Sequence, residues 1–576
     1  MSRITRRYLP PKDRLPDSLS PILRKIYAAR GVIEDHHLHI TLSDLLRPEL
    51  LRGMDCAVSL LSEALQKNLR VLIVADFDAD GATACAVAVR ALKAMGAKHV
   101  EYLIPNRILH GYGLTPAIVE IAAKKSPDLL ITVDNGISSI AEVAMAQSLG
   151  MKVLITDHHV PGQIEPPADA IVNPNGLGDS FQSKSLAGVG VIFYVMLALR
   201  AHLRGQNWFG VNRPEPNLGM LLDLVALGTV ADVVPLDQNN RILVQHGLKQ
   251  MRSGKSCPGI AALARVSRCS TNDIDSADLG FRIGPRLNAA GRIDDMSIGV
   301  QCLLSDNPEE ALFLAEKLDH LNDQRKAIEI EMKDQAIEIL DKIQIGSDLP
   351  WGIVLSEEDW HPGVIGILAS RLKDRFHRPV VAFAPGREQG EQDLRGSVRS
   401  VSGFHARDAL AAIATKYPSM ILRFGGHAAA AGLTIEKNNL DLFSKEFDIE
   451  ARRKLTAEDL QEEILSDGPL EPEDFALSLV EQIKGAGPFG HGFPEPLFDN
   501  VFQCVEKRVL REHHLKLILS TNGSNRIKAI AFGQAKETWV VPGSMLRAAY
   551  RLSCNEYNGK KTLQVRIEFL ENVDSK

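Results

Sequence analysis

The stretch of sequence that decides the fold is VLIVADFDADGAT, residues 71–83. Its first five residues are apolar without polar alternation, which predicts a short strand buried inside a parallel sheet. Three carboxylates follow at every second position, Asp76, Asp78 and Asp80, and a glycine then allows a tight turn into an apolar run that predicts a helix. Three like charges at a strand end are costly unless a cation neutralises them. The stretch therefore indicates a metal site, with a solvated turn as the alternative.

Composition places the chain among multidomain globular proteins. Its 576 residues are too many for one core, and 45% hydrophobic and 24% charged residues are ordinary values. We find no run of about 18 apolar residues and no apolar segment of a secretory signal, so we expect no membrane association. The seven cysteines lack CxxC spacing, which favours a reducing, cytoplasmic setting over a zinc ribbon or a disulfide framework. The net charge of −6 means that any nucleic-acid-binding surface must be local.

Acidic and imidazole side chains recur at one kind of position. From about residue 50 to residue 302, apolar strands alternate with helical stretches, which predicts an α/β fold with a parallel sheet. Three of these strands end in such side chains, and ligands bind at the carboxyl ends of the strands in open parallel sheets. Together with an aspartate that follows a predicted helix, the pooled residues are Asp76, Asp78, Asp80, Asp134, Asp157, His158, His159 and Asp232.

The chemistry of this pool favours hard divalent cations. Carboxylates and imidazoles without thiolates suit Mn²⁺ or Mg²⁺ better than Zn²⁺. The carboxylates are more than one ion needs, and two ions about 3.5–4 Å apart are the arrangement used to hydrolyse phosphate esters. Adjacent residues of an extended chain cannot point the same way, so we expect one of His158 and His159 to bind metal and the other to face the substrate. A structural role is the usual alternative for any single member, but convergence of the set favours a shared site.

The remaining chain predicts further domains. A long helix from residue 309 to about residue 341 has two heptad-like apolar rows that Arg325 and Gln335 interrupt. We expect a rigid strut rather than a coiled coil, with an ordinary helix of one large domain as the alternative. The β-rich runs between residues 497 and 570 predict a small barrel, of which an oligonucleotide-binding barrel is one candidate. The expected units are an N-terminal arm (1–49), a parallel-sheet domain (50–305), the connecting helix (306–346), a second α/β domain (347–465) and the β domain (466–576).

Four motifs resemble, in order and spacing, those of the DHH phosphoesterase superfamily: DFDADG (76–81), VDNG (133–136), DHH (157–159) and ALGTVADVVPL (226–236). Three later motifs narrow the resemblance to its bacterial single-strand-specific DNA exonucleases: RIGPRLNAAGR (282–292), HPGVIGILASRL (361–372) and GGHAAAAG (425–432). The resemblance implies degradation of single-stranded DNA from 5′ to 3′ by two-metal-ion hydrolysis, in DNA recombination and repair. It also implies a parallel-sheet DHH domain, a DHH-associated domain and an OB-like barrel.

The same resemblance assigns roles to residues of the pool. The implied metal ligands are Asp78, Asp80, Asp134, His158 and Asp232, with Asp76 either a ligand or a neighbour of the ligands. His159, next to the substrate phosphate, and Asp157 are the expected catalytic residues. The superfamily often has a histidine four residues before Asp78, where this chain has Val74, so Asp76 is its possible substitute.

Arginine-rich, glycine-punctuated segments suit phosphate oxygens through charge-assisted, often bidentate bonds. With the resemblance, they predict a set of DNA-binding residues: Arg107, Arg282, Arg286, Asn288, Arg292, Arg395, Ser397, Arg399 and His427. We expect the strut to bring the second domain over the metals and leave a basic tunnel too narrow for a duplex. The barrel would then grip the strand further from its 5′ end.

The implied cofactors are two divalent cations, Mn²⁺ or Mg²⁺, and the implied partners are single-stranded DNA with a 5′ end, a single-strand-binding protein and a RecQ-type helicase. No self-pairing helix is evident, so we expect a monomer. Two other functions stay open: a phosphohydrolase of nanoRNA, cyclic dinucleotides or pyrophosphate, and a non-catalytic strand-binding or scaffold protein. Chain length weighs against the first, and the complete set of candidate ligands weighs against the second.

Overall fold

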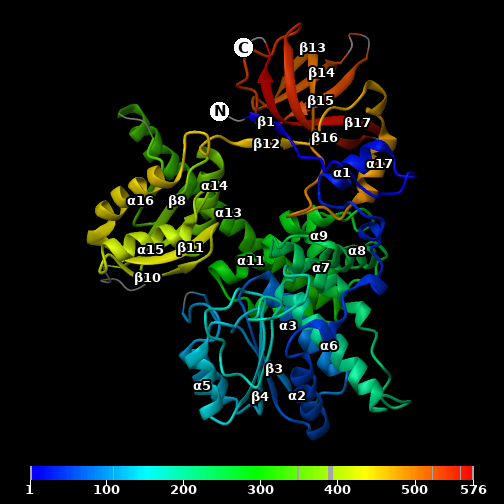
Figure 1. The fold of residues 1–576 in the computed structure, drawn as a ribbon, viewed down its shortest axis with the longest axis vertical. Helices are drawn as coiled ribbons and strands as arrows, with labels where there is room; N and C mark the ends of the chain where they lie inside the picture. Colours follow the sequence, from blue (N-terminus) through cyan, green and yellow to red (C-terminus); the bar gives the residue numbers. More distant parts are fainter. Residues whose placement is uncertain are drawn as a thin grey trace.

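The computed structural model describes residues 3–107, 109–346, 349–386, 393–521, 523, 525–557 and 559–573. A parallel-sheet domain, a second α/β domain and a closed β-barrel follow one another along the chain, and the long helix α13 (Pro308–Gly346) joins the first two (Figure 1). The predicted fold class is confirmed. The predicted start of the second domain at residue 347 and the predicted ends at residues 1 and 576 lie outside the described residues.

The first domain is built on a five-stranded parallel sheet in the order β3-β2-β4-β5-β6. Its strands are β2 (Val71–Ala75), β3 (Val100–Leu103), β4 (Leu129–Val133), β5 (Lys152–Thr156) and β6 (Ala170–Val172). Every residue of β2 and β4 is buried, as expected for parallel strands that are covered on both faces. The chain leaves β2 towards β3 and returns to the other side of β2 to form β4, so the strand order reverses between β2 and β4. Such a reversal opens a crevice at the carboxyl ends of the two strands.

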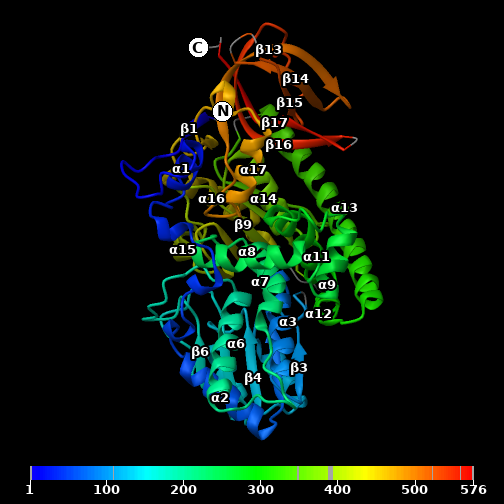
Figure 2. The same ribbon diagram turned by 90° about the vertical axis from the view of Figure 1, so that its right-hand side faces the viewer.

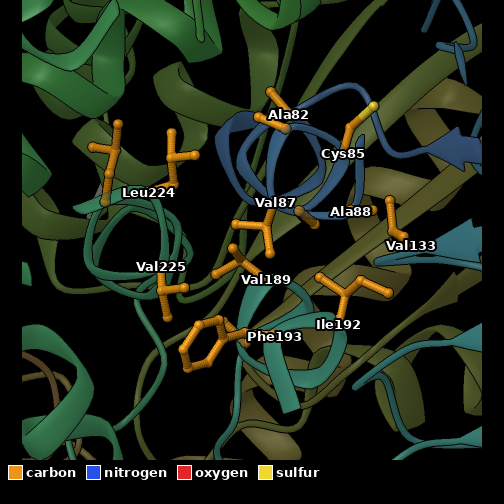
Figure 3. Packing of buried hydrophobic residues seen from close by; sticks show 14 of the residues in the cluster. Ala82, Cys85, Val87, Ala88, Val133, Val189, Ile192, Phe193, Leu224 and Val225 are labelled. Atoms are coloured by element: carbon orange, nitrogen blue, oxygen red, sulfur yellow. The ribbon is translucent and has the colours of Figure 1, made fainter. Parts of the chain in front are cut away.

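Helix α3 (Ala79–Ala94) is the centre of the packing because its side chains are small. Alanines and Cys85 let α6 (Gly188–Gly205) and α7 (Leu222–Ala231) approach it closely. Figure 3 shows Val87 of α3 beside Val189 of α6, with Val225 of α7 near them. The other helical elements of this domain are α2 (Met54–Lys67), α4 (Pro116–Lys124), α5 (Ile140–Ser148), α8 (Gln238–Arg252), α9 (Pro258–Val266), α10 (Ser276–Asp278), the π-helical turn η5 (Leu279–Ile283), α11 (Gly284–Ile293) and α12 (Ser297–Leu304).

Among the described residues, α6 alone is long and apolar enough to cross a membrane. Two thirds of it, 67%, is buried inside the protein, where it packs against α3 and α7. The basic residues of its last turns, Arg200 and Arg204, pair with Glu215. In this fold α6 is a core helix of the first domain.

The second domain contains a mixed sheet in the order β10-β11-β9-β8-β7. Its elements are β7 (Ile353–Ser356), α14 (Ile365–Phe376), β8 (Val380–Pro385), β9 (Asp393–Arg399), α15 (Ala406–Lys416), β10 (Ile421–Gly426), β11 (Ala430–Glu436) and α16 (Leu440–Lys454). Helix α13 packs on α9, α11 and α12 of the first domain and then on α14. At this junction Arg325 is buried beside Glu329, and Arg371 of α14 donates a 2.9 Å hydrogen bond to the same glutamate. The residue that interrupts the apolar row thus belongs to a partly buried polar network, in which the exposed Arg371 links α14 of the second domain to α13.

The last domain is a closed barrel in the order β13-β14-β15-β17-β16. Its strands are β13 (Phe498–Leu510), β14 (His514–Ser520), β15 (Ile527–Ala531), β16 (Met545–Tyr557) and β17 (Lys560–Asn572), and α17 (Leu477–Ala486) packs against it. The N-terminal arm reaches this end of the molecule (Figures 1 and 2). Its β1 (Arg3–Arg6) pairs in parallel with β12 (Glu463–Ser466), and its α1 (Pro21–Ala28) contacts α17.

A buried ion pair fixes the arm to the base of the barrel. Arg30 donates two hydrogen bonds, of 2.7 and 3.0 Å, to the carboxylate of Asp467. The same guanidinium donates to the carbonyl oxygens of Ile26 and Pro494, both at 2.7 Å. Both side chains of the pair are almost fully excluded from solvent. If Arg30 is removed, the Asp467 carboxylate stays buried, with Arg7 Nε at 3.9 Å as its remaining cationic neighbour.

We predict that Arg30→Met loosens the barrel. Breaking a buried pair by removing one partner typically costs about 3–5 kcal/mol, because the remaining charge stays buried. The free energy of unfolding of the barrel should fall by about this amount, measured by hydrogen exchange of β13–β17 in increasing urea. Arg24→Met is the matched control, since its partners Asp13 and Asp17 lie near the surface, and it should leave the exchange unchanged. Equal exchange in both variants would contradict the prediction.

Candidate active site

The predicted pool of acids and imidazoles gathers at the carboxyl ends of β2, β4 and β5. Three sets of side chains each bring their oxygen or nitrogen atoms within 4.8 Å of one another. The sets are Asp76 with Asp78 and Asp134; Asp80 with His158 and Asp232; and Asp134 with His158 and His159. Asp134 and His158 therefore belong to two sets each, and four separate parts of the chain meet at one place.

His158 lies in the middle of this cluster. Its Nε2 is 3.1 Å from Asp134 Oδ1 and 3.5 Å from Asp232 Oδ2. Nevertheless His158 Nε2, Asp134 Oδ1 and Asp76 Oδ1 are buried without a hydrogen-bond partner. Buried polar atoms are normally satisfied, so such a group calls for a partner from outside the chain, such as an ion. The donor set, carboxylate oxygen with imidazole nitrogen, fits Mn²⁺ or Mg²⁺.

Backbone amides fix the two carboxylates that begin α3. Asp78 caps the helix, and its Oδ1 accepts hydrogen bonds from the amides of Asp80 and Gly81 at 2.9 and 3.0 Å. Asp80 accepts hydrogen bonds from the amides of Gly188 and Val189, at 2.7 and 2.8 Å, at the start of α6. Val74, where the superfamily often has a histidine, lies instead in an apolar layer under the sheet and offers no ligand atom.

The electrostatics of the cluster follow from burial. Desolvation raises the pKa of Asp80 to about 7, and repulsion from Asp78 adds to the shift. Burial likewise raises the pKa values of Asp76, Asp134 and Asp232 well above the usual range, and neighbouring carboxylates raise them further. Burial lowers the pKa of His158 to about 4, so its imidazole is neutral and able to act as a ligand. A divalent cation would supply the positive charge that keeps these carboxylates ionised.

Asp157 holds the neighbouring histidine in place. Its Oδ1 accepts hydrogen bonds from the amides of His158 and His159, at 2.7 and 3.1 Å, and lies 2.7 Å from His159 Nδ1. Its Oδ2 accepts from the amide of Ile137 at 2.9 Å. Burial alone would lower the pKa of His159, but the hydrogen bond to Asp157 raises it to about 9. The hydroxyl of Tyr112 lies 3.2 Å from His159 Nε2, the other ring nitrogen.

Two asparagines that the sequence motifs did not reveal support this loop. Asn173 donates a 2.9 Å hydrogen bond to the carbonyl oxygen of His159, and Asn175 donates one of 2.6 Å to that of His158. Both belong to the Asn-Pro-Asn-Gly turn after β6, which is an ordinary turn signal in the sequence. Only the fold shows that this turn contacts the loop that carries His158 and His159.

Glycines let helices α6 and α7 lie close to the acidic cluster and to α3. A Cβ on Gly188 would lie 2.5 Å from Asp134 Cβ, and one on Gly228 would lie 2.2 Å from Thr83 Oγ1. Real Cβ atoms do not come so close to other heavy atoms, so any larger residue at either position would displace the cluster.

An arginine-rich cavity of about 210 Å³ lies between the first and second domains. Its lining consists of Arg107, Arg292, Pro362, Gly363, Ile365, Gly366, Arg395, Gly396, Ser397 and Arg399. These described lining residues include no carboxylate. Burial and repulsion from Arg107 lower the pKa of Arg399. Arg107 Nε is buried without a hydrogen-bond partner, and its guanidinium lies 4.2 Å from the ring centre of Phe77. We name this the terminal cavity.

A larger cavity of about 660 Å³ lies between α11, α13 and α14. Its lining consists of Ser267, Phe281, Arg282, Pro285, Arg286, Asn288, Ala289, Arg292, Asn322, Arg325, Lys326, Glu329, Ile330, Ile367 and Arg371. We name this the helical groove. The predicted DNA-binding residues therefore divide between two cavities that share Arg292. His427 lines neither cavity. Burial lowers the pKa of His427, and repulsion from the nearby His159 lowers it further.

The fold and the site together define a member of the DHH family. The N-terminal domain of that family matches residues 70–229, a DHHA1 domain matches residues 351–452, and a RecJ OB domain matches residues 466–568. The chain belongs to the RecJ family. It is 47% identical over 570 residues to the single-stranded-DNA-specific exonuclease RecJ of Escherichia coli (strain K12), and the match covers 98% of each chain. It is 34% identical over 562 residues to RecJ of Bacillus subtilis (strain 168), covering 96% of this chain and 68% of that one.

Solved structures agree with this assignment. The crystal structure of RecJ from Thermus thermophilus in complex with Mn²⁺ matches with a TM-score of 0.81 and 31% identity, covering 99% of this chain and 79% of that one. The structure of the same protein in complex with Mg²⁺ gives a TM-score of 0.76 at 29% identity, covering 99% and 78%. The family and the fold expected from the motifs are confirmed.

We predict that Gly188→Ala weakens Mn²⁺ binding. The added methyl group overlaps Asp134, and such overpacking costs about 1–3 kcal/mol. Asp134 should move to relieve the overlap, which should lower the Mn²⁺ affinity by about tenfold. Gly205→Ala at the other end of α6 is the control, because nothing lies within 4 Å of its Cβ position. Titration with Mn²⁺ followed by electron paramagnetic resonance measures both. An unchanged Mn²⁺ affinity in Gly188→Ala would refute the proposed crowding.

Proposed function

We propose that this chain is a single-stranded-DNA-specific exonuclease that hydrolyses phosphodiester bonds from the 5′ end with two divalent cations, Mn²⁺ or Mg²⁺. The observation that carries the proposal is the convergence of carboxylates and His158, in which three buried potential ligand atoms have no hydrogen-bond partner. Membership of the RecJ family supports single-stranded DNA as the substrate. The Thermus thermophilus relative is described in complexes with Mn²⁺ and with Mg²⁺, which supports either ion as the cofactor.

The donor atoms suggest which residues would hold the ions. Asp76, Asp78 and Asp134 would hold one ion, and a second would bind Asp80, His158 and Asp232. Asp134 Oδ1 also lies 3.1 Å from His158 Nε2, which supports a position for Asp134 between the two ions, where it could bind both. When bound, divalent cations lower the pKa of water and offset the charge on phosphoryl oxygens.

The residues around these groups would orient the substrate. Because Asp157 engages His159 Nδ1, the proton on Nε2 would be the one offered to a phosphoryl oxygen. A pKa of about 9 keeps that proton in place at neutral pH. Tyr112, within 3.2 Å of the same nitrogen, would limit the positions of the ring. In this mechanism His159 touches the substrate, and Asp157 acts through His159.

The terminal cavity supports 5′ polarity. A terminal phosphate monoester carries close to two negative charges and three strong acceptor oxygens. Arg107, Arg292 and Arg399 would meet these oxygens, and the amino end of α14 adds a favourable dipole. Because Arg107 of this cavity interacts with Asp76 and Asp78, a strand whose 5′ phosphate binds there would bring its first phosphodiester near the candidate metal cluster. A 3′ hydroxyl offers the cavity no charge.

The helical groove supports the restriction to single strands. It contains Arg282, Arg286 and Asn288, and it adjoins the terminal cavity through Arg292. Helix α13 would hold the second domain over the metals so that the basic passage admits one strand, and the barrel would bind the strand further along. The full-length match to RecJ proteins favours this substrate over nanoRNA, cyclic dinucleotides or pyrophosphate. The complete set of candidate ligands favours an enzyme over a non-catalytic scaffold protein.

The biological setting is part of the proposal. All seven cysteines are free, which supports a reducing compartment such as the cytoplasm. Work in DNA recombination and repair would bring the enzyme together with a single-strand-binding protein and a RecQ-type helicase. We propose that it acts as a monomer.

We predict that Asp134→Ala abolishes the Mn²⁺-dependent nuclease activity, with a loss on the order of 10³-fold or more, because both candidate ion positions lose a ligand. Release of acid-soluble nucleotides from a 5′-phosphorylated single strand measures the activity, and EDTA should remove it from the unaltered protein. Asp223→Asn is the matched control: this buried aspartate accepts amide hydrogen bonds from Leu224 and Cys257 and takes no part in the cluster. Full activity in Asp134→Ala would disprove the assignment of the site.

We predict that Arg399→Met removes the preference for a 5′ phosphate. The unaltered protein should degrade a 5′-phosphorylated strand faster than the same strand with a 5′ hydroxyl, since the terminal cavity binds the charge. Loss of one charge-assisted, bidentate contact is worth about 1.5–3 kcal/mol, so the ratio of the two rates should fall by about tenfold or more. Arg452→Met on α16, whose side chain pairs with Asp448 outside both cavities, should keep the ratio. A ratio that Arg399→Met leaves intact would contradict the role of the terminal cavity.

A further inference from the structure

A large aromatic side chain lies exposed at the rim of the helical groove. Phe281 is 84% exposed, whereas Leu279 and Ile283 on either side of it are fully buried. The three residues belong to the π-helical turn η5, a rare geometry that frequently occurs at functional sites. The buried neighbours anchor the turn and leave the ring in solvent.

A second apolar side chain projects into the same groove from another helix. Ile330 of α13 is 54% exposed and lines the groove together with Phe281. Most exposed apolar residues are scattered singly and need no explanation. These two line the same cavity of about 660 Å³.

The charge of the groove indicates what these apolar groups would contact. Its described lining contains six cationic side chains, Arg282, Arg286, Arg292, Arg325, Lys326 and Arg371, and one carboxylate, Glu329. Aspartates just outside the lining pair with some of the cations, for example Asp319 with Arg286 at 2.7 Å. A ligand that fits must be polyanionic and must also carry flat apolar surfaces. Single-stranded DNA has both, with phosphates for the arginines and bases for the ring.

The segment from α10 to α11, whose later part lines the groove, connects the barrel side of the molecule to the candidate metal cluster. At its first end, Ser276 donates a hydrogen bond to the carbonyl oxygen of Phe489 in the segment before the barrel. At the other end, the side chain of Asn288 accepts a 2.9 Å hydrogen bond from the amide of Ala79, beside Asp78 and Asp80. Phe281 stands between these two ends in the chain.

We propose that Phe281 and Ile330 form a base clamp, in which Phe281 stacks on a base of the strand on the 3′ side of the bond to be cut and Ile330 packs against the bases from α13. This inference rests on the proposed function and deepens it. Stacking on a ring tolerates every base, as an exonuclease without sequence preference requires. A base inside a duplex is already stacked and paired, so the clamp also discriminates against double strands.

Binding of fluorescein-labelled oligothymidylate of 30 residues, measured by anisotropy in EDTA, tests the clamp without cleavage. Phe281→Ala should weaken binding on the order of tenfold, Phe281→Trp should restore it, and Ile330→Ala should weaken it to a smaller extent. Phe313→Ala is the matched control, because Phe313 on α13 is 56% exposed and lines neither cavity. Binding of Phe281→Ala equal to that of the unaltered protein would overturn the clamp.

A second measurement separates stacking from a general effect on folding. Strands that carry 2-aminopurine at successive positions from the 5′ end should show one position whose fluorescence is quenched by the unaltered protein and by Phe313→Ala but not by Phe281→Ala. The same quenching in all three proteins would overturn the clamp. Release of nucleotides by the unaltered protein with Mn²⁺ is scored independently, so a failed clamp and a failed exonuclease assignment give different results.

Discussion

The burial of negative charge at the ends of β2, β4 and β5 is the constraint on which the rest of this structure depends. Asp76, Asp80 and Asp134 are nearly inaccessible to solvent and repel one another. Such an arrangement is stable only with compensating cations or bound protons. The small residues of α3 and the glycines of α6 and α7 serve this arrangement, since they let three helices and three strand ends meet at one place.

Positive charge gathers in two cavities, the first of which lies next to the acidic cluster, since Arg107 and Arg292 interact with Asp78. The terminal cavity and the helical groove are lined by arginines from both domains, yet the whole chain carries a net charge of −6. Because α13 packs on the first domain and then on α14, it fixes the basic lining of the second domain relative to the carboxylates of the first. Cationic side chains predominate along both cavities, and Glu329 is the one carboxylate among their described lining residues. Buried Arg325 and Glu329 of α13, with the exposed Arg371 of α14 hydrogen-bonded to the same glutamate, tie α13 to the second domain.

Local sequence patterns predicted the features that depend on neighbouring residues in the chain, such as the buried strand β2 and the acids that follow it. The uninterrupted apolar run of β2 and the acids after it located the sheet and the cluster, because parallel strands present their carboxyl ends at one edge. Arg325 was identified only as an interruption of an apolar row, since Arg371, which shares its glutamate, lies on a different helix. Phe281 carried no signal, because a sequence does not show whether an aromatic residue is buried or exposed. The supporting roles of Asn173 and Asn175 depend on the path of a turn, which spacing does not encode. The roles of the individual site residues stay predictions.

The parallel pairing of β1 with β12 limits how early during synthesis the N-terminal arm can take its final position. The register joins Arg3 to Glu463, so β1 is synthesised long before the strand that it needs. Throughout translation of both α/β domains its backbone amides and carbonyls stay without their partner, and contacts of such long sequence separation form slowly. The β1–β12 pair can therefore form only after both α/β domains have been synthesised. A nascent chain whose first domain has already folded still lacks β12, the strand that pairs with β1 of its N-terminal arm.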